Sequence, residues 1–239
     1  MSNRKRQNMV KTTRPPLPPI INEDDGELPF FKQDFFSDVG LIVQGKKLWT
    51  ARCILAYNSP VFEKQLAPAK KTEIELHNKN YDDVVELLCY LDPRVQYTIT
   101  AQSAKQLLPL AEEYEMFRLR RDCEIVLYHA YGQLRKDHRL GHMPPDVNEE
   151  YLIIADRYKF EELLQMCIAE YVHCTNPDVT KSIVNTETVS ERVKLVILER
   201  KLSRLNAALE RERKYKYDME NKLGTMSPKS KWTNKFGLY

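Results

Sequence analysis

The stretch of sequence that decides the fold is FFSDVGLIVQGKKLWTARCILAYNSPVF, from Phe35 to Phe62. The apolar body of DVGLIVQG ends in a glycine and the chain returns as KKLWTA, which predicts two strands joined by a turn. RCILAYN then suits a short helix that buries its central apolar residues. In the final SPVF, Ser59 is placed to cap a second helix, Pro60 takes its first position and Phe62 its inner face. No residue of the stretch is an obvious catalytic group.

Two further elements follow this stretch. TEIEL, from Thr72 to Leu76, alternates between polar and apolar residues like a third strand. Asn80 then caps the helix YDDVVELLCYL, and Asp82 and Asp83 lie in its first turn, where the helix dipole favours negative charge. The helix carries an apolar stripe, which predicts one buried face, and Pro93 ends it.

Two later segments repeat one pattern. LLPLAEEYEMFRLRRDCEIVL and YLIIADRYKFEELLQMCIAEY both read as a helix, a tight turn and a helix, and they align with an offset of 44 residues. The shared Ala allows close helix approach, Tyr brings a large ring with a polar tip, and Leu and Cys face inward. The pattern predicts stacked helical hairpins, matched at Ala111, Tyr114, Leu119 and Cys123 and at Ala155, Tyr158, Leu163 and Cys167. Residues 129–148, between the two segments, are predicted to form an exposed basic loop.

Leucines recur at alternating steps of three and four residues near the C-terminus, which is the spacing of a heptad seam. The seam consists of Leu195, Leu198, Leu202, Leu205 and Leu209, and it resumes at Met219 and Leu223 after the polar residues Glu212 and Lys216. It predicts a long helix over 189–223, with Ser190 as its cap and Gly224 as its stop. Two interpretations stay open: a self-associating coiled coil, or docking of the upstream half on the helical hairpins.

Composition places the chain among ordinary globular proteins. It has 239 residues, a formal net charge of +3 and 42% hydrophobic residues, enough for a real core. Residues 1–27 and 224–239 are expected to be flexible, and the proline segment from Arg14 to Pro19 suits a spacer or a ligand of proline-binding domains. No apolar run reaches the ~18 residues of a membrane span, and the N-terminus lacks the apolar stretch of a signal peptide. We therefore expect a cytoplasmic or nuclear protein that binds no membrane.

Several classes of site are disfavoured by the polar residues. The basic residues gather at the two ends and in the middle linker, so no folded face for nucleic acid is indicated. The five cysteines are widely spaced and odd in number, which favours buried free thiols over disulfides. No catalytic or nucleotide-binding motif is present, and the clusters His138–His142 and Cys167–His173–Cys174 lack the four converging ligands of structural zinc. The sequence therefore predicts no catalytic residue, no metal site and no cofactor.

A series of segments, taken in order, resembles the BTB (POZ) domain family. They are SDV at Ser37 to Val39, Gly45, ILA at Ile54 to Ala56, SPVF at Ser59 to Phe62, IEL, VVELLCYL, and LLPLAEEYEMFRLRRDCEIVL. The resemblance implies an α+β fold over residues 28–128, with a small mixed sheet flanked by helical hairpins, then an all-α extension over 149–188 and the long helix. Some segments resemble an expanded invertebrate branch whose members often carry a MATH domain, for which we expect no room ahead of this fold.

The resemblance implies a non-enzymatic docking module. BTB domains usually form two-fold dimers through their N-terminal strand and first helices, and the density of aromatic residues there suits a self-complementary contact. We therefore expect a homodimer, with an interface that the resemblance assigns to Phe31, Phe35, Phe36, Ile54, Leu55 and Tyr57.

Many BTB proteins are substrate adaptors of cullin-RING ubiquitin ligases. The resemblance implies cullin contacts at Phe62, Leu66, Met116 and Phe117, although the hydrophobic-x-Glu motif of many adaptors has no match in the basic loop from Gln65 to Glu73. The leading hypothesis is an adaptor that joins a cullin to an unknown protein substrate. The alternative is a dimeric scaffold without a role in ubiquitin transfer, which binds partners through its C-terminal helix and proline segment.

A third use of BTB domains is disfavoured. In the transcriptional repressors of the family, the aspartate that corresponds to Asp38 pairs with a basic residue in the dimer groove. Here the basic residue, Arg52, is displaced by one position. We therefore do not expect co-repressor recruitment.

Overall fold

The computed structural model describes residues 28–67, 71–137 and 143–226, with side chains up to Lys222. The chain divides into two compact units, with the boundary after Ala130. The two predicted tails and the pair His138 and His142 lie outside the described residues, apart from residues 224–226.

The first unit is built on a three-stranded mixed sheet, as predicted. Its strands are β1 (Val39–Val43), β2 (Lys46–Thr50) and β3 (Glu73–Glu75), in the order β2-β1-β3. β1 pairs antiparallel with β2 and parallel with β3. Gln44 and Gly45, with φ of 50° and 75°, form the two-residue turn between β1 and β2. Positive φ at both central positions is the geometry that matches the twist of a hairpin, and Gly45 adopts it without strain.

One glycine in β1 allows the two outer strands to be linked across the sheet. A Cβ at Gly40 would lie 2.2 Å from Cε of Lys47. Because Gly40 has no side chain, Lys47 crosses β1, places its ammonium 4.0 Å over the ring of Trp49 and reaches Glu73 at 2.5 Å. The ion pair therefore joins β2 to β3 over the strand between them.

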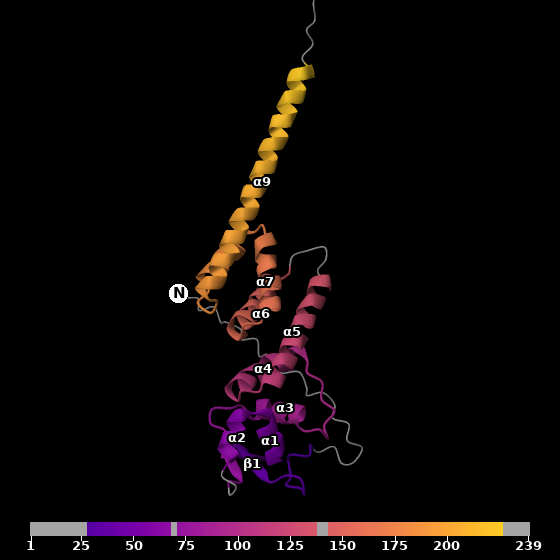
Figure 1. Cartoon of the computed structure of the whole chain (residues 1–239), viewed down its shortest axis with the longest axis vertical. Coiled ribbons are helices and arrows are strands. Elements are labelled where there is room, and N and C mark those ends of the chain that lie inside the picture. The colour runs from indigo at the N-terminus through magenta and orange to yellow at the C-terminus, as the bar shows by residue number, and fades with distance from the viewer. Residues whose placement is uncertain (1–27, 68–70, 138–142, 227–239) are drawn as a thin grey trace, which may run out of the picture. The chain divides into compact units, whose positions relative to one another are not determined.

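Two short helices, α1 (Arg52–Asn58) and α2 (Pro60–Leu66), connect β2 to β3, and Figure 1 shows them beside β1. Ser59 separates the helices and caps α2, because its hydroxyl accepts the N–H of Phe62 at 3.1 Å. The same hydroxyl donates to the carbonyl of Tyr114 at 2.5 Å, and the rings of Phe62 and Tyr114 stack with centroids 4.4 Å apart. The predicted cap is confirmed, and it also ties α2 to a distant part of the chain.

Helix α3 (Tyr81–Leu91) begins at the predicted cap, with Asn80 accepting the N–H of Asp82 at 2.8 Å. It packs against β2, α1 and α4, and all its residues from Val84 to Leu91 except Tyr90 are buried. The predicted apolar stripe is therefore part of a helix that is covered on most sides. Its one buried carboxylate, Glu86, accepts the hydroxyl of Tyr97 at 2.5 Å, which satisfies a group that would otherwise be costly to bury.

The predicted repeat of helical hairpins is confirmed. The first hairpin is α4 (Ala101–Glu113) with α5 (Phe117–Asp137), and the second is α6 (Pro145–Tyr158) with α7 (Glu161–His173). Each turns through one residue in the left-handed region, Glu115 with φ of 52° and Lys159 with φ of 57°. Each turn is closed by the same backbone bond, from Met116 to Ala111 at 2.7 Å and from Phe160 to Ala155 at 2.9 Å. All eight residues matched by the repeat are buried.

The predicted basic loop over residues 129–148 is wrong for most of its length. Helix α5 continues to Asp137 and α6 begins at Pro145, which leaves only 138–142 outside the described helices and the short lead into α6. The buried Tyr131 explains the difference, because its hydroxyl donates to Asn148 at 2.5 Å and Asn148 in turn donates to the carbonyl of Cys167 at 3.3 Å. This long-range packing outweighs the cost of placing Gly132 inside a helix.

The second unit ends in α8 (Pro177–Asn185) and the long α9 (Glu191–Met226), which runs past the predicted stop at Gly224. The first turns of α9 lie beside α7, where Val193 and Ile197 are buried (Figure 1). The upstream half of α9 thus docks on the second helical hairpin, but it does so through Val193 and Ile197 and not through the leucine seam. The hydroxyl of Ser190, the predicted cap, donates to Asp156 at 2.9 Å instead.

We predict that Ser59→Ala lowers the free energy of unfolding by about 2 kcal/mol, because it removes the cap of α2 and leaves the buried carbonyl of Tyr114 without its donor. Urea unfolding followed by Trp49 fluorescence measures the change. Ser203→Ala, on the exposed part of α9, is the matched control and should change the value by less than about 0.5 kcal/mol. Equal effects of the two substitutions would contradict the role given to Ser59.

Candidate protein-interaction surfaces

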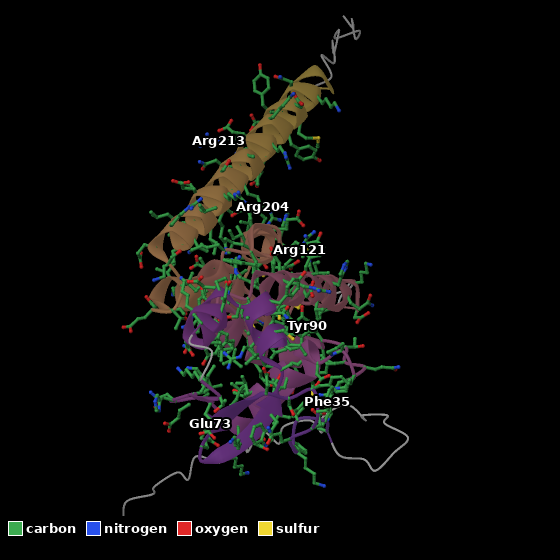
Figure 2. All side chains as sticks on the ribbon, turned by 60° about the horizontal axis from the view of Figure 1, so that its bottom comes forward. Phe35, Glu73, Tyr90, Arg121, Arg204 and Arg213 are labelled. Atoms are coloured by element: carbon green, nitrogen blue, oxygen red, sulfur yellow. The ribbon has the colours of Figure 1, made fainter. Side chains whose placement is uncertain are left out.

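The segment ahead of β1 presents large aromatic side chains to solvent. Phe35 is 96% exposed and Phe36 is also exposed, with the two rings edge to face at a centroid distance of 5.3 Å. Phe31 is partly exposed and packs edge-on against the fully buried Phe30 at 5.4 Å. We call Phe31, Phe35 and Phe36 the aromatic surface, and Figure 2 labels Phe35 on it.

The backbone of the aromatic surface is fixed by one carboxylate. Asp34 accepts the N–H of Phe36 at 2.9 Å, and the N–H and hydroxyl of Ser37 at 2.9 and 2.8 Å, and it forms an ion pair with Arg94. Partial burial acts to raise the pKa of Asp34, but the hydrogen bonds from Arg94, Ser37 and Phe36 outweigh it and hold the pKa below its ordinary value. The carboxylate is therefore ionised at neutral pH and holds the two exposed rings on an ordered turn.

The start of α1 is anchored by Asp38 and Arg52, the pair in which the basic residue is displaced by one position from its place in the repressors of the family. The carboxylate of Asp38 accepts the N–H of Arg52 at 2.6 Å and lies 3.7 Å from its guanidinium. That guanidinium donates to the carbonyl of Leu66 at 2.6 Å and to that of Lys71 at 2.5 Å. Arg52 thus serves as an internal clamp between α1, the end of α2 and the approach to β3.

Only part of α1 can belong to a docking surface. Tyr57 is 86% exposed and Ile54 is half-buried, but Leu55 is fully buried in the core. Leu55 therefore has no surface to offer a partner, which corrects its assignment to the interface. Cys53 lies one helical turn before Tyr57 and is exposed.

The cysteines divide into two groups. Burial raises the pKa of the thiols of Cys89, Cys123 and Cys167 to about 12, so they act as small apolar residues, as predicted. Cys53 is exposed and Cys174 is half-buried, so the prediction of a buried thiol is wrong for these two.

Three of the four residues predicted to contact a cullin lie inside the molecule. Phe62 stacks on Tyr114, Leu66 closes α2 against the core, and Met116 is buried by the hairpin turn. Phe117, the first residue of α5, is 69% exposed. The loop from Gln65 to Glu73 is only partly described, because residues 68–70 lie outside the described part.

Phe117 belongs to a larger exposed face that the sequence did not single out. Arg121 and Ile125 follow it at steps of four residues on α5, and both are exposed. Residues at this spacing lie on one side of a helix, so the three form a continuous strip. We call Phe117, Arg121 and Ile125 the α5 surface, and Figure 2 labels Arg121.

The predicted seam of α9 is exposed along its whole described length. The five seam leucines are between 39% and 60% exposed, and every described side chain from Leu202 to Lys222 is exposed. Figure 2 shows side chains that project on all sides of this part of α9 around Arg213. We call Leu195, Leu198, Leu202, Leu205 and Leu209 the leucine stripe.

The second unit contains a groove that the sequence pattern does not predict. It has a volume of about 550 Å³ and lies between the end of α7, α8 and α9. Its lining is largely apolar and also includes Lys181, Lys201 and Arg204. Lys201 donates to Thr180 and Arg204 to the carbonyl of Val172, so these two cations also hold α9 in place.

In the described part of the chain, no group of three or more His, Cys, Asp or Glu side chains could hold a metal ion. No helix among the described residues combines the length and the hydropathy needed to span a membrane. The aromatic surface, the α5 surface and the leucine stripe each expose large apolar or aromatic side chains, which is the chemistry of protein contacts.

The family comparison matches the first unit. The model of the BTB/POZ domain matches residues 28–131. Similar curated proteins include "TD and POZ domain-containing protein 1-like" of Mus musculus, 29% identical over 51% of this chain and 34% of that protein. "BTB and MATH domain-containing protein 42" of Caenorhabditis elegans is 28% identical over 46% of this chain and 32% of that protein. The chain thus spans about a third of the length of these relatives.

Solved structures of the same domain are also similar to this chain. The BTB domain of zebrafish PATZ1 is 20% identical, with a TM-score of 0.33 over 38% of this chain and 75% of that one. The BTB domain of human gigaxonin is 22% identical, with a TM-score of 0.32 over 37% and 75%. The predicted resemblance to BTB proteins, including those with MATH domains, is confirmed by the family model and the curated relatives. Residues 28–131 of this chain therefore match the BTB/POZ domain, a kind of domain that generally serves as a non-enzymatic module for protein interaction.

Proposed function

We propose that this protein is a dimeric adaptor that joins a cullin-RING ubiquitin ligase to a protein substrate. The observation that carries the proposal is a BTB domain that presents two separate exposed apolar faces, the aromatic surface and the α5 surface. An adaptor needs one face for its own copy and another for the ligase. The second helical hairpin, with its groove, is then available for a substrate.

The aromatic surface suits the dimer contact. Exposed aromatic rings bury large areas when they pair, and an ordered backbone loses little conformational freedom on binding. Asp34 supplies that order through four hydrogen bonds. Tyr57 adds a third highly exposed ring from the same unit. A two-fold contact between such faces is self-complementary, because each copy contributes the same residues.

The α5 surface suits the cullin contact. Phe117 is a single large ring at a helix start, and the buried Met116 beside it fixes the position of the turn. Arg118 and Arg121 flank the ring and are exposed, so they can give the contact orientation and selectivity. Of the cullin contacts implied by the resemblance, Phe117 is the one whose side chain is accessible.

A dimeric scaffold without a role in ubiquitin transfer is the second candidate. The observation that favours it is that Phe62, Leu66 and Met116 are buried and that the usual adaptor motif has no match between Gln65 and Glu73. The exposed leucine stripe would then be the main site for partners.

For the dimer contact we predict that Phe35→Asp with Phe36→Asp weakens self-association of the BTB domain at least about 30-fold, since losing a buried aromatic anchor costs about 2 kcal/mol or more. The measurement is sedimentation equilibrium in a Leu209→Glu background, which places a charge on the leucine stripe and leaves the BTB contact to be read alone. The double variant should stay folded, because both rings are exposed in the single chain.

The matched control for the dimer is Phe117→Asp, which should leave self-association intact. A parent chain that is already monomeric in this background, or a double variant that associates as tightly as the parent, would show that the aromatic surface is not the dimer contact.

For the ligase contact we predict that the N-terminal domain of the BTB-binding cullin binds the purified chain, and that Phe117→Asp weakens binding at least tenfold, or about 1.4 kcal/mol. Calorimetric titration measures the affinity. Tyr217→Asp, at a similarly exposed aromatic residue of α9, is the control and should bind like the parent. A folded, dimeric sample that gives no heat of binding would favour the scaffold over the adaptor.

A further inference from the structure

The leucine stripe belongs to a longer heptad pattern that is interrupted at its centre. After Leu202, Leu205 and Leu209, the seam positions are taken by Glu212 and Lys216, and Met219 restores the apolar pattern. Helix α9 continues through this polar pair to Met226, so the pair lies well inside the helix. Met219 is 41% exposed, so the stripe also offers apolar surface beyond the interruption.

The exposed part of α9 has its midpoint at the polar pair. From Leu202 onward every described side chain is exposed, whereas the turns before it are held on α7 by Val193 and Ile197. The segment from Leu202 to the helix end at Met226 has its midpoint at Lys214, halfway between Glu212 and Lys216. The interruption is therefore symmetric within this exposed segment, whose first turns are also tied to α7 by the bond from Arg204 to the carbonyl of Val172.

We propose that this segment of α9 pairs with α9 of a second copy of the chain in an antiparallel coiled coil centred on Lys214. In that register Glu212 of one copy lies opposite Lys216 of the other, and the pair occurs twice because of the two-fold axis. Leu209 lies opposite Met219, and Leu205 and Leu202 lie opposite positions 223 and 226. The polar layers are electrostatically complementary, and the layers formed by Leu209 and Met219 are apolar.

The parallel arrangement is disfavoured by the same residues. In a parallel pair each seam position faces its own copy, so Glu212 would lie against Glu212 and Lys216 against Lys216. Two layers of like charge in the middle of the contact repel each other, and polar residues at seam positions are the usual means by which a coiled coil selects one register. The charge pattern thus selects both the partner and its direction.

The residues that flank the axis fit this arrangement. Tyr215 is exposed and next to the axis, where it would meet the Tyr215 of the second copy in an aromatic contact. Arg213 stands on the other flank, and its guanidinium is already paired with Glu210 at 2.9 Å. The positive charge of each Arg213 near the axis is therefore balanced by the carboxylate of Glu210 on the same helix.

Crosslinking tests the direction of pairing in the full chain and does not depend on the BTB dimer or on a cullin. In a background with Cys53→Ser and Cys174→Ser, only the three buried native thiols remain. Leu209→Cys and Met219→Cys are made as two separate variants and oxidised mildly, first alone and then mixed after subunit exchange. We expect disulfide-linked dimers only in the mixture. Lys214→Cys, which faces away from the seam, is the control and should not crosslink.

The other outcomes overturn the proposal. If each variant crosslinks with itself as well as it does in the mixture, the helices are parallel. If no combination crosslinks more than the Lys214→Cys control, the stripe does not pair with a second copy.

Charge reversal tests the register independently. In the Phe35→Asp and Phe36→Asp background, Glu212→Lys or Lys216→Glu alone should raise the dissociation constant of the α9 pair at least about tenfold, because each puts like charges opposite one another. The double reversal should restore the parent value, since the two charges then exchange places and each again faces its opposite on the second copy. Sedimentation equilibrium gives the constants. A double reversal that stays as weak as the single ones would refute the antiparallel register.

Discussion

The fold of the first unit depends on one buried hydroxyl, that of Ser59. It accepts the N–H of Phe62 and donates to the carbonyl of Tyr114, 55 residues away in the chain. Because a buried polar group must keep its partners, the two bonds fix where α2 lies relative to the end of α4. In that position the rings of Phe62 and Tyr114 are stacked.

The helical hairpin that contains Tyr114 occurs twice in the chain. Both copies have the same turn geometry, but they pack against different neighbours. In the first copy Tyr114 stacks on Phe62 of α2, whereas in the second Tyr158 stacks on Phe160 of its own turn at 5.9 Å. Asp156, beside Tyr158, accepts the N–H and hydroxyl of Ser190 and so anchors the start of α9. One structural unit therefore serves first to complete the BTB domain and then to support the long helix.

The sequence could predict what is decided locally. The turn at Gly45, the caps at Ser59 and Asn80 and the repeated hairpins each depend on residues within a few positions of one another. For residues 129–137 the sequence predicts a loop, because Gly132 suggests a break in the helix. The hydrogen bond from Tyr131 to the distant Asn148 explains why this segment is helical, and local sequence does not reveal it. The sequence could suggest Phe117 as a contact residue. It could not show that the neighbouring Met116 is buried or that Phe117 shares an exposed face with Ile125, because both depend on packing with distant elements. Periodicity identifies a face of a helix, yet it does not say which faces other elements will cover.

The aromatic surface, the α5 surface and the exposed part of α9 differ in how their charges can select a partner. The charge within the aromatic surface, that of Asp34, is paired with Arg94 of the same unit, so the selectivity of this surface must come mainly from shape and from the fixed turn. In the exposed part of α9, Glu212 and Lys216 face each other across a pair of identical helices only when the two helices run antiparallel. Arg118 and Arg121 beside Phe117 lack such a pattern, so this face gains more from a partner that supplies the opposite charge than from a second copy of itself. Under the two proposals made above, the chain would separate recognition of itself from recognition of other proteins by the arrangement of a few charges around otherwise similar apolar contacts.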